Sequence, residues 1–136
     1  MDTLDVLAVP ENLPEVLDFI NGHLALADCE SRLMTQIDVA VEEVFVNISS
    51  YAYHPETGSA QILFGMRENS QTAVIRFSDE GKPYNPLEKP DPNLSLPLRE
   101  RKRGGLGIYM VKKSMDDVAY EYKDGRNVLT IMKRIG

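Results

Sequence analysis

The chain has 136 residues, a hydrophobic fraction of 43%, a charged fraction of 26% and a net charge of −6. This length suits one domain with a full two-layer core, and the composition is ordinary for a soluble globular protein. The acidic balance argues against nucleic-acid binding, which needs a basic surface, although many domains are acidic for solubility alone.

The N-terminus and the cysteine content predict the compartment. No basic stretch is followed by an apolar run, so we expect no signal peptide, and no apolar run approaches the roughly 20 residues that span a membrane. Cys29 is the only cysteine, so no intramolecular disulfide can form, which fits a reducing compartment. We therefore expect a cytoplasmic protein with no membrane partner.

The first part of the chain predicts a strand followed by two helices. The apolar run 4–9 predicts the strand, and Pro10 suits the first turn of a helix over about 10–27. A second helix is expected over about 30–52, and its apolar residues recur at steps of three and four. They are Leu33, Ile37, Val41, Val44, Phe45, Ile48 and Ala52. Val39 and Val46 point the other way, which predicts that this helix is covered on more than one side.

The middle of the chain predicts two strands and a long loop. After a turn cluster at 54–58 the apolar period changes from helical to extended, which predicts strands over 60–66 and 72–78. Residues 79–103 contain five prolines and no regular period. Because such a long loop inside a domain is usually functional, we expect a flexible lid at about 80–104.

The last part predicts a short helix and a hairpin. The helix is expected over 107–115, and the strands 117–123 and 127–133 flank Asp124-Gly125, a strong hairpin signal. Helices on one face of a mixed, mostly antiparallel sheet give an α+β two-layer sandwich, with residues 1–136 as a single domain.

Glu43 and Asn47 form the first candidate motif. They lie four residues apart in the second predicted helix, so their side chains share one face beside the apolar stripe, whereas Glu42 lies on the other flank and is expected at the surface. An Asn carbonyl is a hard oxygen ligand for Mg²⁺, and a Glu one turn away can orient or deprotonate the group that attacks a phosphate. The simpler interpretation is a solvated helix edge.

Asp79 and Gly81 form the second motif, directly after a predicted strand. A carboxylate there can accept a hydrogen bond from an exocyclic amine such as adenine N6, and glycine lets the backbone approach a flat ring closely. An ordinary acidic turn after a strand would look the same.

Gly104-Gly105-Leu106-Gly107 forms the third motif, immediately before the short helix. Free amides at a helix start, with glycines that permit close approach, favour bound phosphate, but a flexible hinge is the alternative. Basic side chains crowd its approach, which suggests a local anion site or a solvated lid. They are Arg99, Arg101, Lys102 and Arg103. No His, Cys or Ser elsewhere stands in a metal-ligating or nucleophilic context.

In this order, the three motifs resemble those of the GHKL ATPase superfamily, whose nucleotide-binding domain has the Bergerat fold. Within it the chain is most similar to the small anti-sigma-factor serine kinases of bacteria, and the resemblance covers nearly the whole chain. It implies that Asn47 holds Mg²⁺, that Glu43 is the catalytic base or orienting residue, and that Asp79 reads the adenine of ATP.

The resemblance extends to the other candidate contacts. The anti-sigma form of the second motif, Asp-x-Gly-x-Pro-aromatic-Asn-Pro, matches Asp79 to Pro86, which adds Gly81 and Pro83 to the expected nucleotide contacts. Arg103 stands where the family often places a basic residue near the terminal phosphate. Residues 104–110 would enclose the phosphates. The contacts expected there are Gly104, Gly105, Leu106, Gly107 and Ile108. Tyr84 stands where Phe is commoner and Tyr51 where many relatives have His.

Two functions of different kinds remain open. The first is a Mg²⁺-ATP-dependent protein serine kinase that phosphorylates a STAS-type anti-sigma antagonist, sequesters a sigma factor and forms a homodimer. The second is a nucleotide-binding switch or partner-binding module without phosphotransfer. A domain cut from a sensor kinase is disfavoured, because no phosphoacceptor-His helix is evident.

Overall fold

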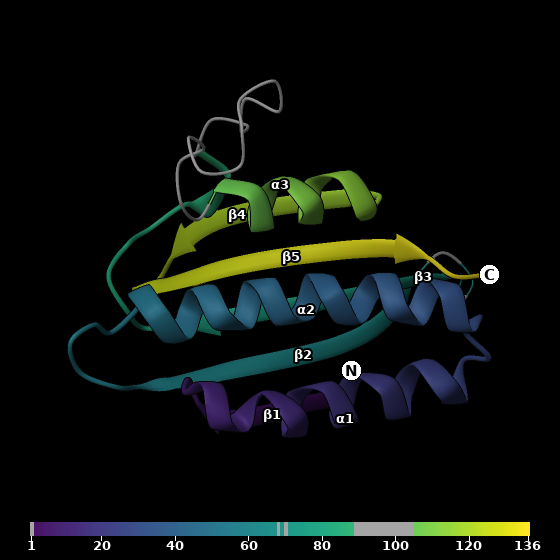
Figure 1. Cartoon of the computed structure of the whole chain (residues 1–136), viewed down its shortest axis with the longest axis horizontal. Helices are drawn as coiled ribbons and strands as arrows, with labels where there is room; N and C mark the ends of the chain where they lie inside the picture. Colours follow the sequence, from purple (N-terminus) through teal and green to yellow (C-terminus); the bar gives the residue numbers. More distant parts are fainter. Residues whose placement is uncertain (1, 68, 70, 89–104) are drawn as a thin grey trace.

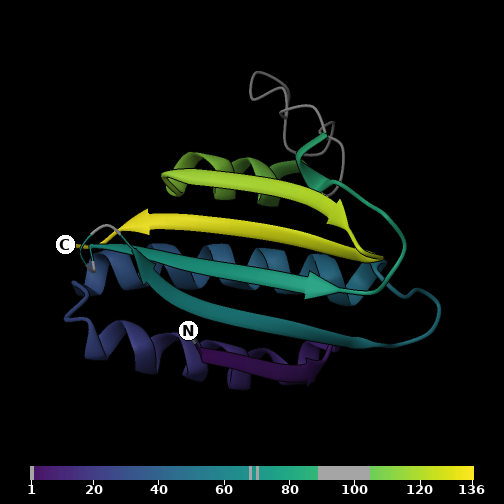
Figure 2. The same ribbon diagram turned by 180° about the vertical axis from the view of Figure 1, so that it is seen from behind.

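The computed structural model describes residues 2–67, 69, 71–88 and 105–136. The chain forms one antiparallel sheet in the order β1-β2-β3-β5-β4, with three α-helices on one face (Figures 1 and 2). The strands are β1 (Asp2–Leu7), β2 (Ser59–Arg67), β3 (Thr72–Asp79), β4 (Asp117–Lys123) and β5 (Arg126–Arg134). The helices are α1 (Leu13–Leu26), α2 (Ser31–Tyr51) and α3 (Gly105–Ser114). The predicted α+β two-layer sandwich is confirmed.

The predicted strands differ from the structure in several details. All four strand pairings in the described part of the chain are antiparallel, so the sheet is not mixed. β1 starts and ends two residues earlier than predicted because residues 2–7 pair with β2. β3 continues through Asp79, which the prediction placed in the loop, because Asp79 pairs with both Ala60 and Asn127. Of the predicted lid at 80–104, the structure describes 80–88, where Pro86–Glu88 form a 3₁₀ turn.

α2 crosses the middle of the sheet, α1 lies over β1 and β2, and α3 lies over β4 and β5 (Figure 1). The predicted apolar stripe of α2 is buried at its centre, where Ile37, Val41 and Phe45 have no exposed surface. Val39 and Val46 are 46% and 39% exposed, so these two valines stay outside the core, although α2 packs against α1 and α3 as well as the sheet. The helix is therefore covered on more than one side, as predicted, but not at the two valines on which the prediction rested.

The hairpin β4–β5 fixes the register that matters for the site. Asp124 and Gly125 both have positive φ, at 54° and 78°, which is the backbone of the two-residue turn that their sequence predicts. From this turn β5 runs back along β3, and Asn127 comes to lie opposite Asp79. Two polar side chains distant in sequence therefore meet at the helix-covered face, beside α2.

Candidate nucleotide-binding site

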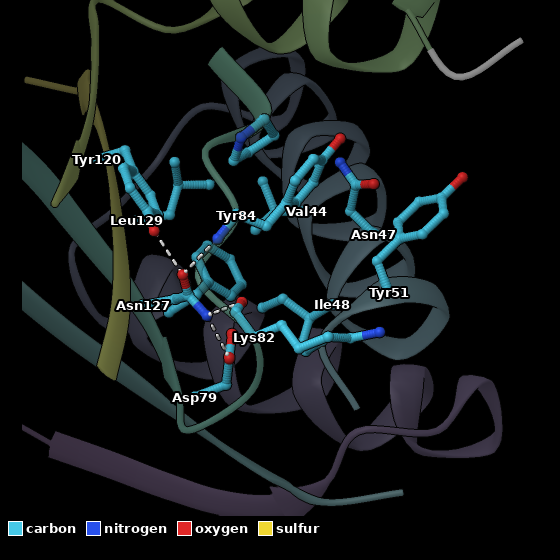
Figure 3. Close-up of a pocket in the computed structure, with 13 residues that line it drawn as sticks. Val44, Asn47, Ile48, Tyr51, Asp79, Lys82, Tyr84, Tyr120, Asn127 and Leu129 are labelled. Carbon is cyan, nitrogen blue, oxygen red and sulfur yellow. Dashed lines mark hydrogen bonds between the residues drawn. The ribbon is translucent and has the colours of Figure 1, made fainter. Parts of the chain in front are cut away.

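A cavity lies between α2 and the adjoining ends of β3 and β5, bordered by the segment 82–86 (Figure 3). Its walls are mostly apolar, and its polar groups gather where β3 and β5 meet. The lining residues are Val44, Asn47, Ile48, Tyr51, Ala52, Phe77, Asp79, Lys82, Tyr84, Pro86, Tyr120, Asn127 and Leu129. A flat apolar slot with a few convergent polar groups is the usual form of a small-ligand site.

Asp79 supplies the carboxylate at the polar end of the cavity. Only 4% of the residue is exposed. Its Oδ1 accepts hydrogen bonds from the Gly81 amide and from Asn127 Nδ2, both at 2.9 Å. In the described part of the chain, no residue donates a hydrogen bond to Oδ2 of Asp79. A ligand that carries an N–H donor can therefore bind this second oxygen.

The turn after Asp79 is held against the C-terminal end of α2. A β-carbon at Gly81 would lie 2.6 Å from the carbonyl carbon of Ala52, so no side chain fits there. The Lys82 amide donates to the Ala52 carbonyl at 2.9 Å, and the Lys82 ammonium donates to the His54 carbonyl at 3.0 Å. These bonds satisfy carbonyls at a helix end and place a cation at the negative end of the helix dipole.

Tyr53 fixes the other side of this turn. Its hydroxyl donates to the Ser59 carbonyl at 2.6 Å and accepts from the Glu80 amide at 2.8 Å. Burial raises the pKa of the Tyr53 hydroxyl, so the group stays protonated and keeps donating at neutral pH. The Arg126 guanidinium also pairs with the Glu80 carboxylate at 2.6 Å. The backbone that follows Asp79 is thus anchored independently of any ligand.

Asn47 and Glu43 lie farther along α2, as their spacing predicts. Asn47 lines the cavity, and its amide lies beside the rings of Tyr51 and Tyr84 (Figure 3). Glu43 lies one turn earlier and packs against α3: a β-carbon at Gly107 would lie 2.9 Å from its carboxyl carbon and closer still to Oε2. Glu43 of the first motif therefore contacts Gly107 of the third motif. Asn47 lies between this contact and Asp79.

The other predicted contacts have different outcomes. α3 begins at Gly105, two residues earlier than predicted, so Gly105 and Gly107 lie in the first turn of the helix rather than before it. Ile108 is buried, with 3% exposure, so its side chain faces the interior, which leaves the backbone as its means of reaching a phosphate. Pro83 lies in the segment after Gly81 but is absent from the cavity lining.

Other predicted groups lie beyond what the structure describes. Arg103, Gly104 and the basic residues before them lie wholly outside the described residues. For Leu106, only the backbone is described.

Sequence reasoning missed Asn127, Lys82 and Tyr120, all of which line the cavity. A signal for Asn127 existed: on β5 it shares a face with Leu129 and Ile131, which are buried. A polar residue in line with buried apolar residues on one strand face needs a buried partner. The partner, Asp79, could be identified only once the pairing of β3 with β5 was known.

The mouth of the cavity carries two aromatic rings. The centroids of Tyr51 and Tyr84 are 5.9 Å apart, and the residues are 49% and 36% exposed. The volume enclosed behind them is about 40 Å³. Because sites for small ligands usually measure about 300 Å³ or more, the cavity must widen before a purine base enters.

The cavity is an apolar slot that ends in the buried carboxylate of Asp79. Asn47 of α2 lines it, and the glycine-containing start of α3 lies beside Glu43. This arrangement is typical of a nucleotide-binding domain of the ATPase class. The chain matches the family model of the histidine kinase-like ATPase domain over residues 6–133, and it belongs to that family. Membership implies ATP binding, and the predicted family resemblance is confirmed.

Two relatives are serine kinases. The chain is 28% identical over 131 residues to the serine/threonine-protein kinase BtrW of Bordetella bronchiseptica, a match that covers 96% of this chain and 91% of that one. It is 30% identical over 93 residues to the serine-protein kinase RsbW of Bacillus thuringiensis, covering 67% of this chain and 58% of RsbW. The chain thus matches less than two thirds of the length of RsbW.

A solved structure supports the fold. The histidine kinase AdeS of Acinetobacter baumannii superposes with a TM-score of 0.50 at 12% identity, and the match covers 100% of this chain and 70% of AdeS. At that identity the likeness shows the shared fold alone.

The described residues hold neither a metal-binding cluster nor a membrane-spanning helix. No group of three or more His, Cys, Asp or Glu side chains could hold a metal ion there. No helix among them is long and apolar enough to cross a bilayer.

Proposed function

We propose that this chain is a Mg²⁺-ATP-dependent protein serine kinase that phosphorylates a STAS-type anti-sigma antagonist. When the antagonist is phosphorylated, the kinase sequesters a sigma factor. The proposal includes a homodimer in the cytoplasm, and neither nucleic acid nor a membrane as partner. One observation carries it: Asp79 and Asn47 line the same cavity, and Glu43 lies one turn from Asn47, against the start of α3.

The base end of the cavity suits adenine. The exocyclic amine would donate to Oδ2 of Asp79, while the ring would pack between apolar walls that include Val44, Ile48 and Leu129. Burial of Asp79 makes this hydrogen bond selective, because a base without the amine would leave the carboxylate oxygen unpaired.

The phosphate end suits a metal held by few protein groups. Mg²⁺ is commonly bound by one or two protein ligands together with phosphates and water, so the carbonyl of Asn47 fits it without a larger cluster. When bound, the metal would neutralise phosphate charge. Glu43 would then accept the proton of the attacking serine hydroxyl or orient that hydroxyl, which is the role of the acidic residue in phosphoryl transfer.

The test has two stages. Calorimetric titration of the wild-type protein with ATP, with and without Mg²⁺, should show metal-dependent binding. Glu43→Gln should then keep ATP affinity within about threefold and lower the rate of serine phosphorylation of a STAS-type antagonist by about 10²- to 10⁴-fold. Glu42→Gln is the matched control, because Glu42 is the exposed neighbour on the same helix turn and should leave both measurements unchanged.

Other results would change the proposal. Metal-dependent ATP binding without phosphoserine on any candidate antagonist would favour a nucleotide switch, in which the pocket sets a conformation that a partner reads. No binding at millimolar ATP would refute the nucleotide site itself.

A further inference from the structure

Asn127 makes an unusually complete set of hydrogen bonds at the base end of the cavity. It is 7% exposed. Its Nδ2 donates to Asp79 Oδ1 at 2.9 Å and to the Lys82 carbonyl at 2.8 Å (Figure 3). The Gly81 carbonyl lies 3.4 Å from the same nitrogen. Asn127 Oδ1 accepts from the Tyr84 amide at 3.0 Å and the Tyr120 hydroxyl at 2.5 Å. One side chain therefore joins β3, β4, β5 and the segment 81–84.

The chemistry of the neighbours requires an amide at this position. The groups facing Nδ2 are a carboxylate and two carbonyls, which only accept, and those facing Oδ1 are an amide N–H and a hydroxyl, which donate. Burial raises the pKa of Tyr120, so its hydroxyl stays protonated and remains a donor. A carboxylate of the same shape would face Asp79 and two carbonyls with an acceptor, and an apolar side chain would leave several buried polar groups unpaired.

We infer that Asn127 is the positioning residue that gives this site its preference for a base with an exocyclic amine. By engaging Oδ1 of Asp79 together with the Gly81 amide, Asn127 holds the carboxyl group so that Oδ2 remains for the ligand. The same amide binds the segment 82–84 through the Lys82 carbonyl and the Tyr84 amide. Base recognition and the position of Tyr84 at the cavity mouth are thus fixed by one side chain. This inference rests on the proposed nucleotide site and concerns its selectivity.

The experiment compares two nucleotides. Calorimetry would measure the affinity of wild-type protein for ATP and for purine riboside triphosphate, which has hydrogen in place of the 6-amino group. Wild type should prefer ATP by about tenfold or more, as expected for one buried hydrogen bond to a charged group. Asn127→Asp should weaken ATP binding by about 10- to 100-fold and the analogue much less, so that the ratio of the two affinities approaches one.

A milder variant and a control keep the test decisive. Tyr120→Phe removes one of the two donors to Asn127 Oδ1 and should lower the ratio of the two affinities by about threefold. If circular dichroism shows that Asn127→Asp does not fold, the result of Tyr120→Phe decides whether the inference holds. Tyr122→Phe is the matched control, because Tyr122 lies on the same strand, is 47% exposed and is absent from the cavity lining. Its ratio should equal that of wild type.

The possible failures can be told apart. If wild type binds neither nucleotide, the proposed function fails. If wild type prefers ATP and the folded Asn127 and Tyr120 variants weaken both nucleotides by the same factor, Asn127 is only structural and the inference is wrong. A fall in the ratio with both variants, and none with Tyr122→Phe, supports it.

Discussion

Gly81 and Gly107 lie at the base end and the phosphate end of the proposed site, and at both positions another group occupies the space of a side chain. At Gly81 that group is backbone: the carbonyl of Ala52 at the end of α2. At Gly107 it is the end of a flexible side chain, the carboxylate of Glu43. A β-carbon is therefore excluded in both places, but by partners of very different stiffness.

The difference indicates how the two ends work. The base end is a rigid receptor, because Asp79, the turn after it and the end of α2 are fixed by backbone contacts and by the hydrogen bonds of Asn127. The phosphate end is adjustable, because a carboxylate that packs against a glycine can move by rotating its own side chain. Selective binding of a base needs the first property, and a group that must meet a reacting hydroxyl benefits from the second.

Gly81→Ala should have the largest effect of any single change. The added carbon meets the Ala52 backbone, so the turn must leave α2 and break the Lys82–Ala52 bond. We expect unfolding to become easier by about 1–3 kcal/mol, measured by urea denaturation, and ATP affinity to fall by at least about 100-fold. Gly22→Ala is the control, because nothing lies within 4 Å of a β-carbon there and alanine stabilises a helix interior by about 0.5–1 kcal/mol. Equal stability of the two variants would contradict a rigid base end.

Gly107→Ala should separate rate from stability. Its β-carbon displaces the Glu43 carboxylate, which can swing aside, and alanine favours the helix, so the free energy of unfolding should change by less than about 1 kcal/mol. A catalytic group displaced by about 1 Å can cost about 100-fold in rate, and we expect that loss in antagonist phosphorylation with ATP affinity nearly unchanged. Destabilisation as large as that of Gly81→Ala would show that both ends are equally rigid.

Asp79→Asn should weaken ATP binding by about 1–3 kcal/mol, roughly 5- to 150-fold in dissociation constant. The amide keeps the shape of the carboxyl group, but an NH₂ then faces either Asn127 Nδ2 and the Gly81 amide or the amine of the base. Calorimetric titration with ATP measures the loss. An unchanged affinity would remove Asp79 from the base end and leave only the phosphate end of the comparison.

The sequence located part of the candidate site, although the roles of its residues stay predictions. Glu43 and Asn47 were found because helical spacing places them on one face regardless of tertiary structure. Asp79 and Gly81 were found because they are adjacent to a strand end. Asn127 was not found because its role depends on the pairing of β3 with β5, which is a non-local contact that local periodicity does not encode.

The errors in the fold have the same origin. The limits of β1 and β3 moved because strand pairing, rather than apolar pattern, decides where a strand ends. The cover of α2 was expected at Val39 and Val46, which stay exposed, whereas α1 and α3 pack against other parts of the helix. Periodicity showed which face is apolar enough to pack against the sheet, but it could not show how many partners the helix has.

A change at Asp38, on α2 but remote from both glycines, should have the smallest effect and shows whether the large effects are local. Burial raises the pKa of the Asp38 carboxyl above its usual 3.8, an effect that a hydrogen bond with Asn21 opposes only in part. The folded state therefore holds the proton more tightly than the unfolded chain, so stability falls as the pH rises from about 3.8 through the folded pKa, and the cost is complete at neutral pH. Asp38→Asn removes the cost of burying the ionised carboxylate. It should raise Tm at pH 7 by about 1–3 °C, without altering ATP affinity. Below the unfolded pKa both proteins carry a neutral group, so the difference in Tm should vanish there. A gain in Tm that persists at low pH would mean that the variant acts by packing, and a change in ATP affinity would mean that α2 transmits small changes along its length to the site.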